Sequence, residues 1–420
     1  MTAPLRIRTS HAFAIAIASS VAVGAMSAMD WRLPVAVVGA VAYWLLPVDI
    51  EIFLVMTALS GILGVDQVKI LPVATTAITL PEVLFGALVA KWLFTRMTSI
   101  LRVPTEQKVW LGTLGVYGAI GFLRGNLRQL WFRDVRAQMF WLIVPVLYSL
   151  GGEARKRLLR MLEWLAITVA AAVYIQAMLP SRTIVDNSAV VTGIYRVRPF
   201  GQELVFFEFA MLIARMISGN ARWWQAAVAL LYSGALVLSY SRNFLVAMGM
   251  ALLIALVLGQ GGFARKASWA AAAGVVAAAV TVLSSSFATR FIHELSPHYL
   301  TVESSSIFAR IKQLELGWAY FVHHLFGAGL GSTYIAGSIA GGYSDIWYLW
   351  LAINLGIVGL VVFLVMVTVR VVHLWKHRTW QKVGYIAFLV TLLARCFVTA
   401  IPYAPMGIGL IAITLTPTDD

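Results

Sequence analysis

Apolar segments of roughly membrane-spanning length recur along this chain of 420 residues and limit what it can fold into. A helix needs about 20 apolar residues to cross a bilayer. Candidate spans lie at 11–29, 33–48, 50–64, 80–95, 109–123, 137–151, 161–179, 201–218, 222–241, 243–260, 268–286, 346–369, 383–400 and 402–416. The sequence therefore predicts an all-α polytopic membrane protein with 12–14 transmembrane helices, and an even number is favoured.

Composition supports this class. Hydrophobic residues make up 60% of the chain and charged residues 12%, whereas soluble domains average about 25% charged residues. A soluble enzyme, a disordered chain and a collagen-like chain are thereby excluded. The single cysteine, Cys396, excludes an internal disulfide. Arg6 and Arg8 precede the first apolar run, but no small-residue cleavage site follows them, so we expect a retained first span rather than a signal peptide.

The distribution of the net charge of +14 indicates both orientation and ligand. With the N-terminus in the cytoplasm and alternating spans, 18 Lys and Arg fall inside and 13 outside, which together with Arg395 inside a span account for all 32. This bias predicts cytoplasmic termini. Eleven of the outer 13 are arginine, the side chain that holds phosphate or carboxylate through two parallel hydrogen bonds. The outer face is therefore expected to hold an anion; contact with lipid headgroups is the alternative for the cluster at 124–136.

The spans and loops form a single transmembrane domain over residues 1–420. N-terminal helices occupy 1–180 and are followed by a periplasmic loop at 180–200. Central helices at 201–286, a large periplasmic loop at 287–345 and C-terminal helices at 346–420 complete the chain. Long ordered loops are usually functional, and each of these two is expected to carry short amphipathic helices.

The second loop contains an amphipathic helix over 304–325, because apolar residues recur there at spacings of three and four. A mostly polar stripe on the same helix consists of Arg310, Gln313, Gly317, Tyr320 and His324. Two interpretations stay open. The helix lies at the membrane interface with a solvated face, or it covers an outward cavity with Arg310 directed into it.

Glycines at 327, 329 and 331 follow this helix, and Asp345 stands at the head of the next span. Glycine lets a backbone approach a ligand or another helix closely, and no strand precedes this run, so a dinucleotide site is rejected. Asp345 is either a helix N-terminal residue or a functional acid. The Asp49-x-Glu51 pair resembles a metal-dependent acid pair but falls on the cytoplasmic side between two doubtful spans.

The order of these motifs is similar to a known pattern. Ser-x-Ser-Arg at 239–242 is followed by an outer loop with Arg310, Trp318 eight residues later and the glycine run, and then by the sequence Asn-Leu-Gly-Ile-Val-Gly at 354–359. Over about residues 190–365 this resembles the O-antigen ligase / O-antigen polymerase superfamily of bacterial envelope polysaccharide glycosyltransferases.

The resemblance implies a GT-C type fold in the bacterial inner membrane, an active site facing the periplasm, and an undecaprenyl diphosphate-linked oligosaccharide as donor. Arginines of the outer loops hold the diphosphate without a metal or other cofactor, and Arg198, Arg242 and Arg310 match their positions. Arg196 is an equally placed rival to Arg198. Arg290, Gln313, Tyr320 and His324 are further expected substrate contacts. No nucleic acid is expected as a partner; a chain-length regulator and a flippase are.

Ligases of this superfamily usually carry a histidine at the head of the span after the glycines, where this chain has Ser344-Asp345. The departure favours a polymerase over a ligase and makes Asp345 the first candidate for the catalytic base, with Glu203 the second. The expected function is an inverting polysaccharide polymerase. The alternatives are an O-antigen ligase, or a related enzyme that glycosylates protein, and a transporter of an anionic solute.

Overall fold

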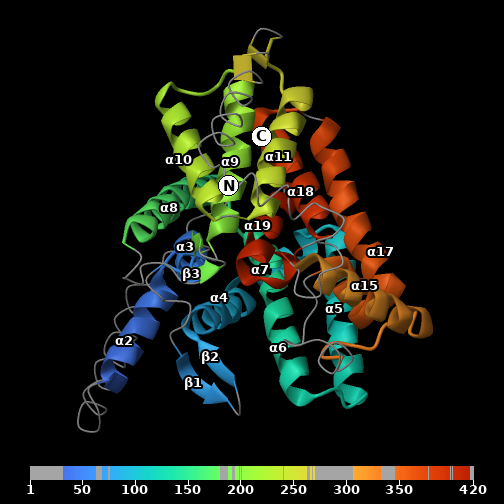
Figure 1. The fold of residues 1–420 in the computed structure, drawn as a ribbon. Helices are drawn as coiled ribbons and strands as arrows, with labels where there is room; N and C mark the ends of the chain where they lie inside the picture. Colours follow the sequence, from blue (N-terminus) through green and yellow to red (C-terminus); the bar gives the residue numbers. More distant parts are fainter. Residues whose placement is uncertain are drawn as a thin grey trace.

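The computed structural model of the chain describes residues 32–62, 69–73, 76–179, 188–191, 194–197, 199, 201–239, 241–262, 265–266, 268–269, 306–332, 346–376, 378–397, 399 and 401–416. The first expected span lies outside these residues, as does the one at 268–286 except for its first two residues. Within them the protein is a helical bundle with two small hairpins (Figure 1).

The helices reproduce most of the predicted spans, with ends shifted by a few residues. They are α2 Arg32–Leu45, α3 Val48–Ala58, α4 Leu80–Arg96, α5 Thr105–Leu123, α6 Arg128–Met139, α7 Ile143–Leu147, α8 Gly152–Met178, α9 Gln202–Ile217, α10 Trp224–Leu238, α11 Arg242–Leu258, α15 Ser306–His323, α17 Trp347–Lys376, α18 Trp380–Arg395 and α19 Pro405–Leu415, with 3-10 turns η2 Met97–Arg102, η3 Phe140–Leu142 and η4 Ile401–Tyr403.

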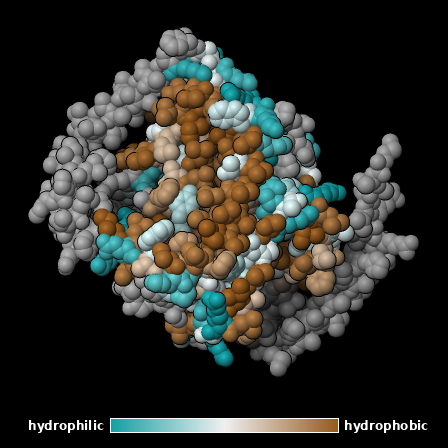
Figure 2. Space-filling model, turned by 90° about the vertical axis from the view of Figure 1, so that its right-hand side faces the viewer, coloured by the Kyte–Doolittle hydropathy of each residue, from teal (hydrophilic) through white to brown (hydrophobic). Residues whose placement is uncertain are grey.

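Three of the described helices are long and apolar enough to cross a membrane: Leu80–Arg102, Gly152–Met178 and Trp347–Lys376. Shorter apolar helices include α10 and α19. On α17 an aliphatic stripe at helical spacing is exposed: Ile357, Val361, Val365, Val369 and Val372. Figure 2 shows hydrophobic side chains over the middle of the α17 face and hydrophilic ones gathered towards its edges. The chain is thus an all-α protein with several candidate membrane spans.

The predicted span at 137–151 is wrong as a single helix. Its residues belong to the end of α6, the 3-10 turn Phe140–Leu142 and the five-residue α7. Pro145 has no amide hydrogen with which to continue a helix from upstream. The segment is nevertheless buried, including Trp141 and Val144. Irregular backbone at membrane depth is tolerated where protein surrounds it.

The short amphipathic helices expected in the first loop are not found in its described part. β3 Ser188–Val191 and β4 Ile194–Val197 pair as an antiparallel hairpin. β3 ends in two valines and β4 contains isoleucine, tyrosine and valine, residue types that suit an extended, half-buried surface. A second antiparallel hairpin, β1 Lys69–Val73 with β2 Thr76–Thr79, precedes α4 and was not predicted.

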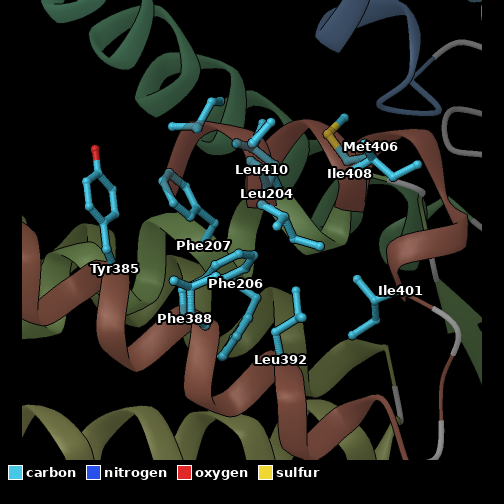
Figure 3. Packing of buried hydrophobic residues seen from close by; sticks show 14 of the residues in the cluster. Leu204, Phe206, Phe207, Tyr385, Phe388, Leu392, Ile401, Met406, Ile408 and Leu410 are labelled. Carbon is cyan, nitrogen blue, oxygen red and sulfur yellow. The ribbon is translucent and has the colours of Figure 1, made fainter. Parts of the chain in front are cut away.

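The core is centred on α9, whose residues are nearly all buried by α18, α11, α10 and α8. Phe206, Phe207 and Phe388 pack ring against ring, and Leu204, Met406 and Leu410 lie beside them (Figure 3). α19 is buried along its whole length although it is only 11 residues long. An all-round apolar helix of this kind belongs in the interior.

Candidate functional site

Three helix N-termini and one C-terminus meet at one end of the bundle. α9 starts at Gln202, α11 at Arg242 and α17 at Trp347, and α18 ends at Arg395. The amide of Trp347 donates to the carbonyl of Cys396 at 3.0 Å. Asn243 Nδ2 of α11 donates to Thr399 Oγ1 just after α18. Because the N-terminus of a helix carries partial positive charge, three of them together favour an anion.

A buried ion pair joins α9 to α18 at this end. Arg395 Nη1 and Nη2 donate to the two carboxylate oxygens of Glu203, each at 2.7 Å. The Arg395 side chain is 4% exposed and that of Glu203 15%. The guanidinium also lies 4.2 Å from the ring centroid of Phe244 and 5.3 Å from that of Phe206. The pair therefore fixes the first turn of α9 against both α11 and α18.

This contact bears on the proposed bases. Both oxygens of Glu203 accept hydrogen bonds from Arg395, so its carboxylate is already engaged in the described structure. Asp345 lies outside the described residues.

Sequence reasoning did not assign Arg395 a role. A lone arginine inside an apolar run is the signal that could have found it, since such residues are costly unless paired.

The predicted diphosphate ligands are only partly described. Arg242 is the first residue of α11 and Arg196 lies in β4, but the description does not extend to their side chains. Arg198 and Arg290 lie outside the described residues. Arg310 is half-buried on α15, and its Nε is buried without a hydrogen bond in the part of the chain described. That nitrogen is thus an unsatisfied donor within the described residues.

α15 packs most of its polar stripe on the protein and leaves Ile311, Leu314 and Trp318 of its apolar stripe exposed, while Phe321 of that stripe is buried. Gln313 is 5% exposed, and a Cβ at Gly317 would lie 2.5 Å from Leu349 of α17. Trp318 is 64% exposed. The exposed face also carries Lys312 and Glu315, so it mixes apolar and charged side chains as a helix at the membrane interface does. Gln313 and Gly317 of the polar stripe thus face α17 and are not solvated, whereas both interpretations of the helix as a whole stay open.

The other stripe residues lie on the same side. Tyr320 packs against the buried cluster of Ile346, Leu349 and Ile353, which forms the start of α17. The ring of His324 lies 4.3 Å from that of Tyr320, and His324 is exposed. Arg310 is on this face too, seven residues before Gly317. α15 thus carries its arginine on the face that crosses the first turns of α17.

The glycine run serves backbone packing. Gly327, Gly329 and Gly331 all have φ near +80°. Added Cβ atoms there would lie 2.4–2.5 Å from backbone atoms of α17, α5 and α6 respectively. Asn126 Nδ2 donates to the carbonyls of residues 328–330. Of the two uses expected for these glycines, the structure shows close approach to helices. The loop is clamped between the α5–α6 turn and the break in α17 at Gly356 (φ 64°).

Arginines of the 124–136 cluster take part in this packing. Arg124 Nη1 donates to the carbonyl of Gly327 at 3.0 Å. Arg136 pairs with Glu82 at 2.7 Å and donates to the carbonyl of Ala77. These two arginines have internal partners, so the outer excess of arginine is not all available to a ligand.

The described residues contain no cluster of three or more His, Cys, Asp or Glu side chains able to hold a metal. Asp49 accepts from Arg157 of α8, and Glu51 accepts from Lys91 of α4 at 2.9 Å. Each carboxylate is buried and bound to a different cation, so the two acids have a structural role. Cys396 is buried and unpaired in the part of the chain described.

Comparison with known proteins adds no family. No protein-family model matches the chain, and no curated protein matches it. The class is therefore set by the fold alone: a helical membrane protein whose helix N-termini, a buried Glu–Arg pair and an arginine-bearing helix gather at one end.

Proposed function

We propose that the chain is a bacterial inner-membrane polysaccharide polymerase with a GT-C type fold of 12–14 spans and both termini in the cytoplasm. It transfers a glycan from undecaprenyl diphosphate to a lipid-linked repeat unit on the periplasmic side. The observation that carries the proposal is that the N-termini of α9, α11 and α17 meet at one end of the bundle, where α15 packs on the first turns of α17. Arg242 begins α11, Arg310 lies on α15, and Arg395 pairs with Glu203 in the first turn of α9.

The chemistry follows from the charge that develops. A hydroxyl of the acceptor sugar attacks the anomeric carbon, and the bond from that carbon to the diphosphate oxygen breaks with inversion. The leaving undecaprenyl diphosphate gains negative charge, which fixed arginines stabilise in a water-poor site. Arg242 and Arg310 are assigned this role, with Arg198 or Arg196. Asp345 takes the proton of the hydroxyl as general base.

The ion pair with Arg395 changes the role that we assign to Glu203. Its carboxylate holds Arg395, and Arg395 in turn contacts Phe244, two residues after Arg242. We therefore assign Glu203 first to positioning the α9–α11–α18 junction and only second to proton transfer.

The transporter alternative has one specific observation in its favour. α3 and α19 are both 11 residues long, each begins at or just after a proline, and they meet where a Cβ at Gly409 would lie 2.8 Å from Met56 Sδ. Paired short helices are a feature of transport sites. Against this, aromatic and aliphatic side chains surround the first part of α19 (Figure 3). The polar side chains at its C-terminal end, Gln107, Arg155 and Arg370, are engaged in hydrogen bonds to carbonyl groups of residues 413–416.

Deletion of the gene in its host distinguishes the functions by what accumulates. Loss of a polymerase leaves single repeat units on undecaprenyl diphosphate. Loss of a ligase leaves long chains on undecaprenyl diphosphate that never reach their final acceptor. Loss of a transporter of another solute leaves the lipid-linked glycans unchanged, and that result would refute the proposal. Plasmids carrying wild type or Arg242→Ala, with matched membrane levels, then test the arginine.

Orientation is tested separately. Cysteine at Val190, in β3, should react with a membrane-impermeant maleimide in cells whose outer membrane has been opened. The native Cys396 gives little background because it is buried. Reaction only after inner-membrane lysis would contradict an outward-facing site.

A further inference from the structure

A cavity of about 640 Å³ lies at the opposite end of the bundle, where α11 and α17 end. Its lining includes Leu258, Gln260, Lys266, Trp375, Lys376 and Arg378. α11 and α17 begin at the candidate site, so the cavity is separated from that site by the length of both helices. Nothing in the proposed transfer reaction uses it.

The lining is cationic and contains no carboxylate among the residues described. Lys266, Lys376 and Arg378 supply three positive charges. Arg378 is held in place, because its carbonyl accepts from Gln260 Nε2 at 2.7 Å and its guanidinium lies 4.7 Å from the centroid of Trp375. A concave site with three cations and no internal counter-charge is suited to an anion.

The surroundings place this cavity at the level of lipid headgroups. Trp375 lines it, and Trp380, Trp223 and Trp224 stand at the same end of the bundle, at the starts of α18 and α10. Tryptophan gathers where a membrane protein crosses the interface. Further along the two helices, towards their middles, exposed aliphatic side chains include Leu253 and Val372.

We propose that this cavity binds the phosphodiester of an anionic membrane phospholipid, with its acyl chains along the exposed aliphatic residues of α11 and α17. Basic pockets between transmembrane helices are a known means of holding such headgroups. A soluble phosphate would use the same cations but would gain nothing from the aliphatic residues beside them. The partial negative charge at the C-termini of α11 and α17 also favours cations there without any ligand. The test below separates the phospholipid from the soluble phosphate and from this effect of the helix ends.

The first measurement uses native mass spectrometry of the full chain in detergent, titrated with phosphatidylglycerol or phosphatidylcholine. A triple variant, Lys266→Gln, Lys376→Gln and Arg378→Gln, is compared with a control triple at exposed cations on the same side, Arg102→Gln, Lys156→Gln and Arg160→Gln. Each cation contributes about fivefold to the binding of an anionic lipid, so the cavity triple should lose roughly 100-fold in affinity. The control should stay within about threefold of wild type.

Unchanged binding in the cavity triple would overturn the proposal, as would an equal loss in the control. Competition by glycerol phosphate as strong as that by phosphatidylglycerol would assign the site to a soluble anion instead. A second measurement needs no variant. Phosphatidylglycerol, but not phosphatidylcholine, should protect Lys266 and Lys376 of the wild-type chain from an amine-acylating reagent while Lys156 stays reactive; equal acylation of all three would refute the site.

Discussion

The ion pair between Glu203 and Arg395 provides a quantitative test of what holds the outer end of the bundle together. Two hydrogen bonds of 2.7 Å link side chains that are 15% and 4% exposed. Removing one partner of a buried pair costs about 3–5 kcal/mol, because the other charge is left without compensation. We expect Arg395→Met to lower the free energy of unfolding by that amount.

Glu203→Gln should cost less. Arg395 keeps its contacts with the faces of Phe244 and Phe206, each worth about 0.5–2 kcal/mol. Glutamine also retains one hydrogen bond to the guanidinium. We therefore expect a loss of about 1–3 kcal/mol for Glu203→Gln. The double variant should be more stable than the sum of the two single losses predicts, by about 2–3 kcal/mol.

The assay is equilibrium unfolding of the purified protein in mixed micelles with increasing fractions of a denaturing detergent, followed by tryptophan fluorescence. Glu153 and Lys156 form the matched control, since that pair is 3.1 Å apart but its side chains are 87% and 66% exposed. Its coupling energy should stay below about 0.5 kcal/mol. A coupling that is equally small for Glu203 and Arg395 would refute the idea that this pair fixes α9 against α18.

Three further outcomes are expected. Arg310→Ala should reduce polymer formation about 30- to 1000-fold, with poor rescue by lysine, whereas Lys312→Ala, an exposed cation on the same helix, should be near normal; equal effects would remove the diphosphate role. Gly329→Ala should prevent stable accumulation in the membrane, because its Cβ would lie 2.4 Å from Gly121 N at a φ of +83°, while Gly115→Ala, which has open space around it, should accumulate normally. Asp345→Asn should reduce turnover of purified lipid-linked repeat units about 10²–10⁴-fold if Asp345 is the base, and should be nearly silent if it only starts a helix.

The sequence by itself determined the class of fold. Runs such as 201–218 and 346–369 have too few polar residues for anything except buried or lipid-facing helices, and the structure has α9 and α17 there. The amphipathic helix at 304–325 was also predictable, since period and capping are local properties of about 20 residues. The short strands at 69–79 and 188–197 were not, because hairpins of four or five residues carry little periodic signal.

Tertiary structure decided the partners. Glu203 and Arg395 are separated by 192 residues in the chain, and neither residue type nor spacing indicates that the start of α9 meets the end of α18. The same holds for the glycine run. From the sequence, these glycines could lie against either a ligand or another helix, and in the structure they lie against the helix backbone at Gly121 and Gly356. It holds again for α15, whose polar stripe faces α17. In a membrane the apolar face of a helix needs no protein partner, so the hydrophobic pattern that predicts the helix does not predict which side of it is buried.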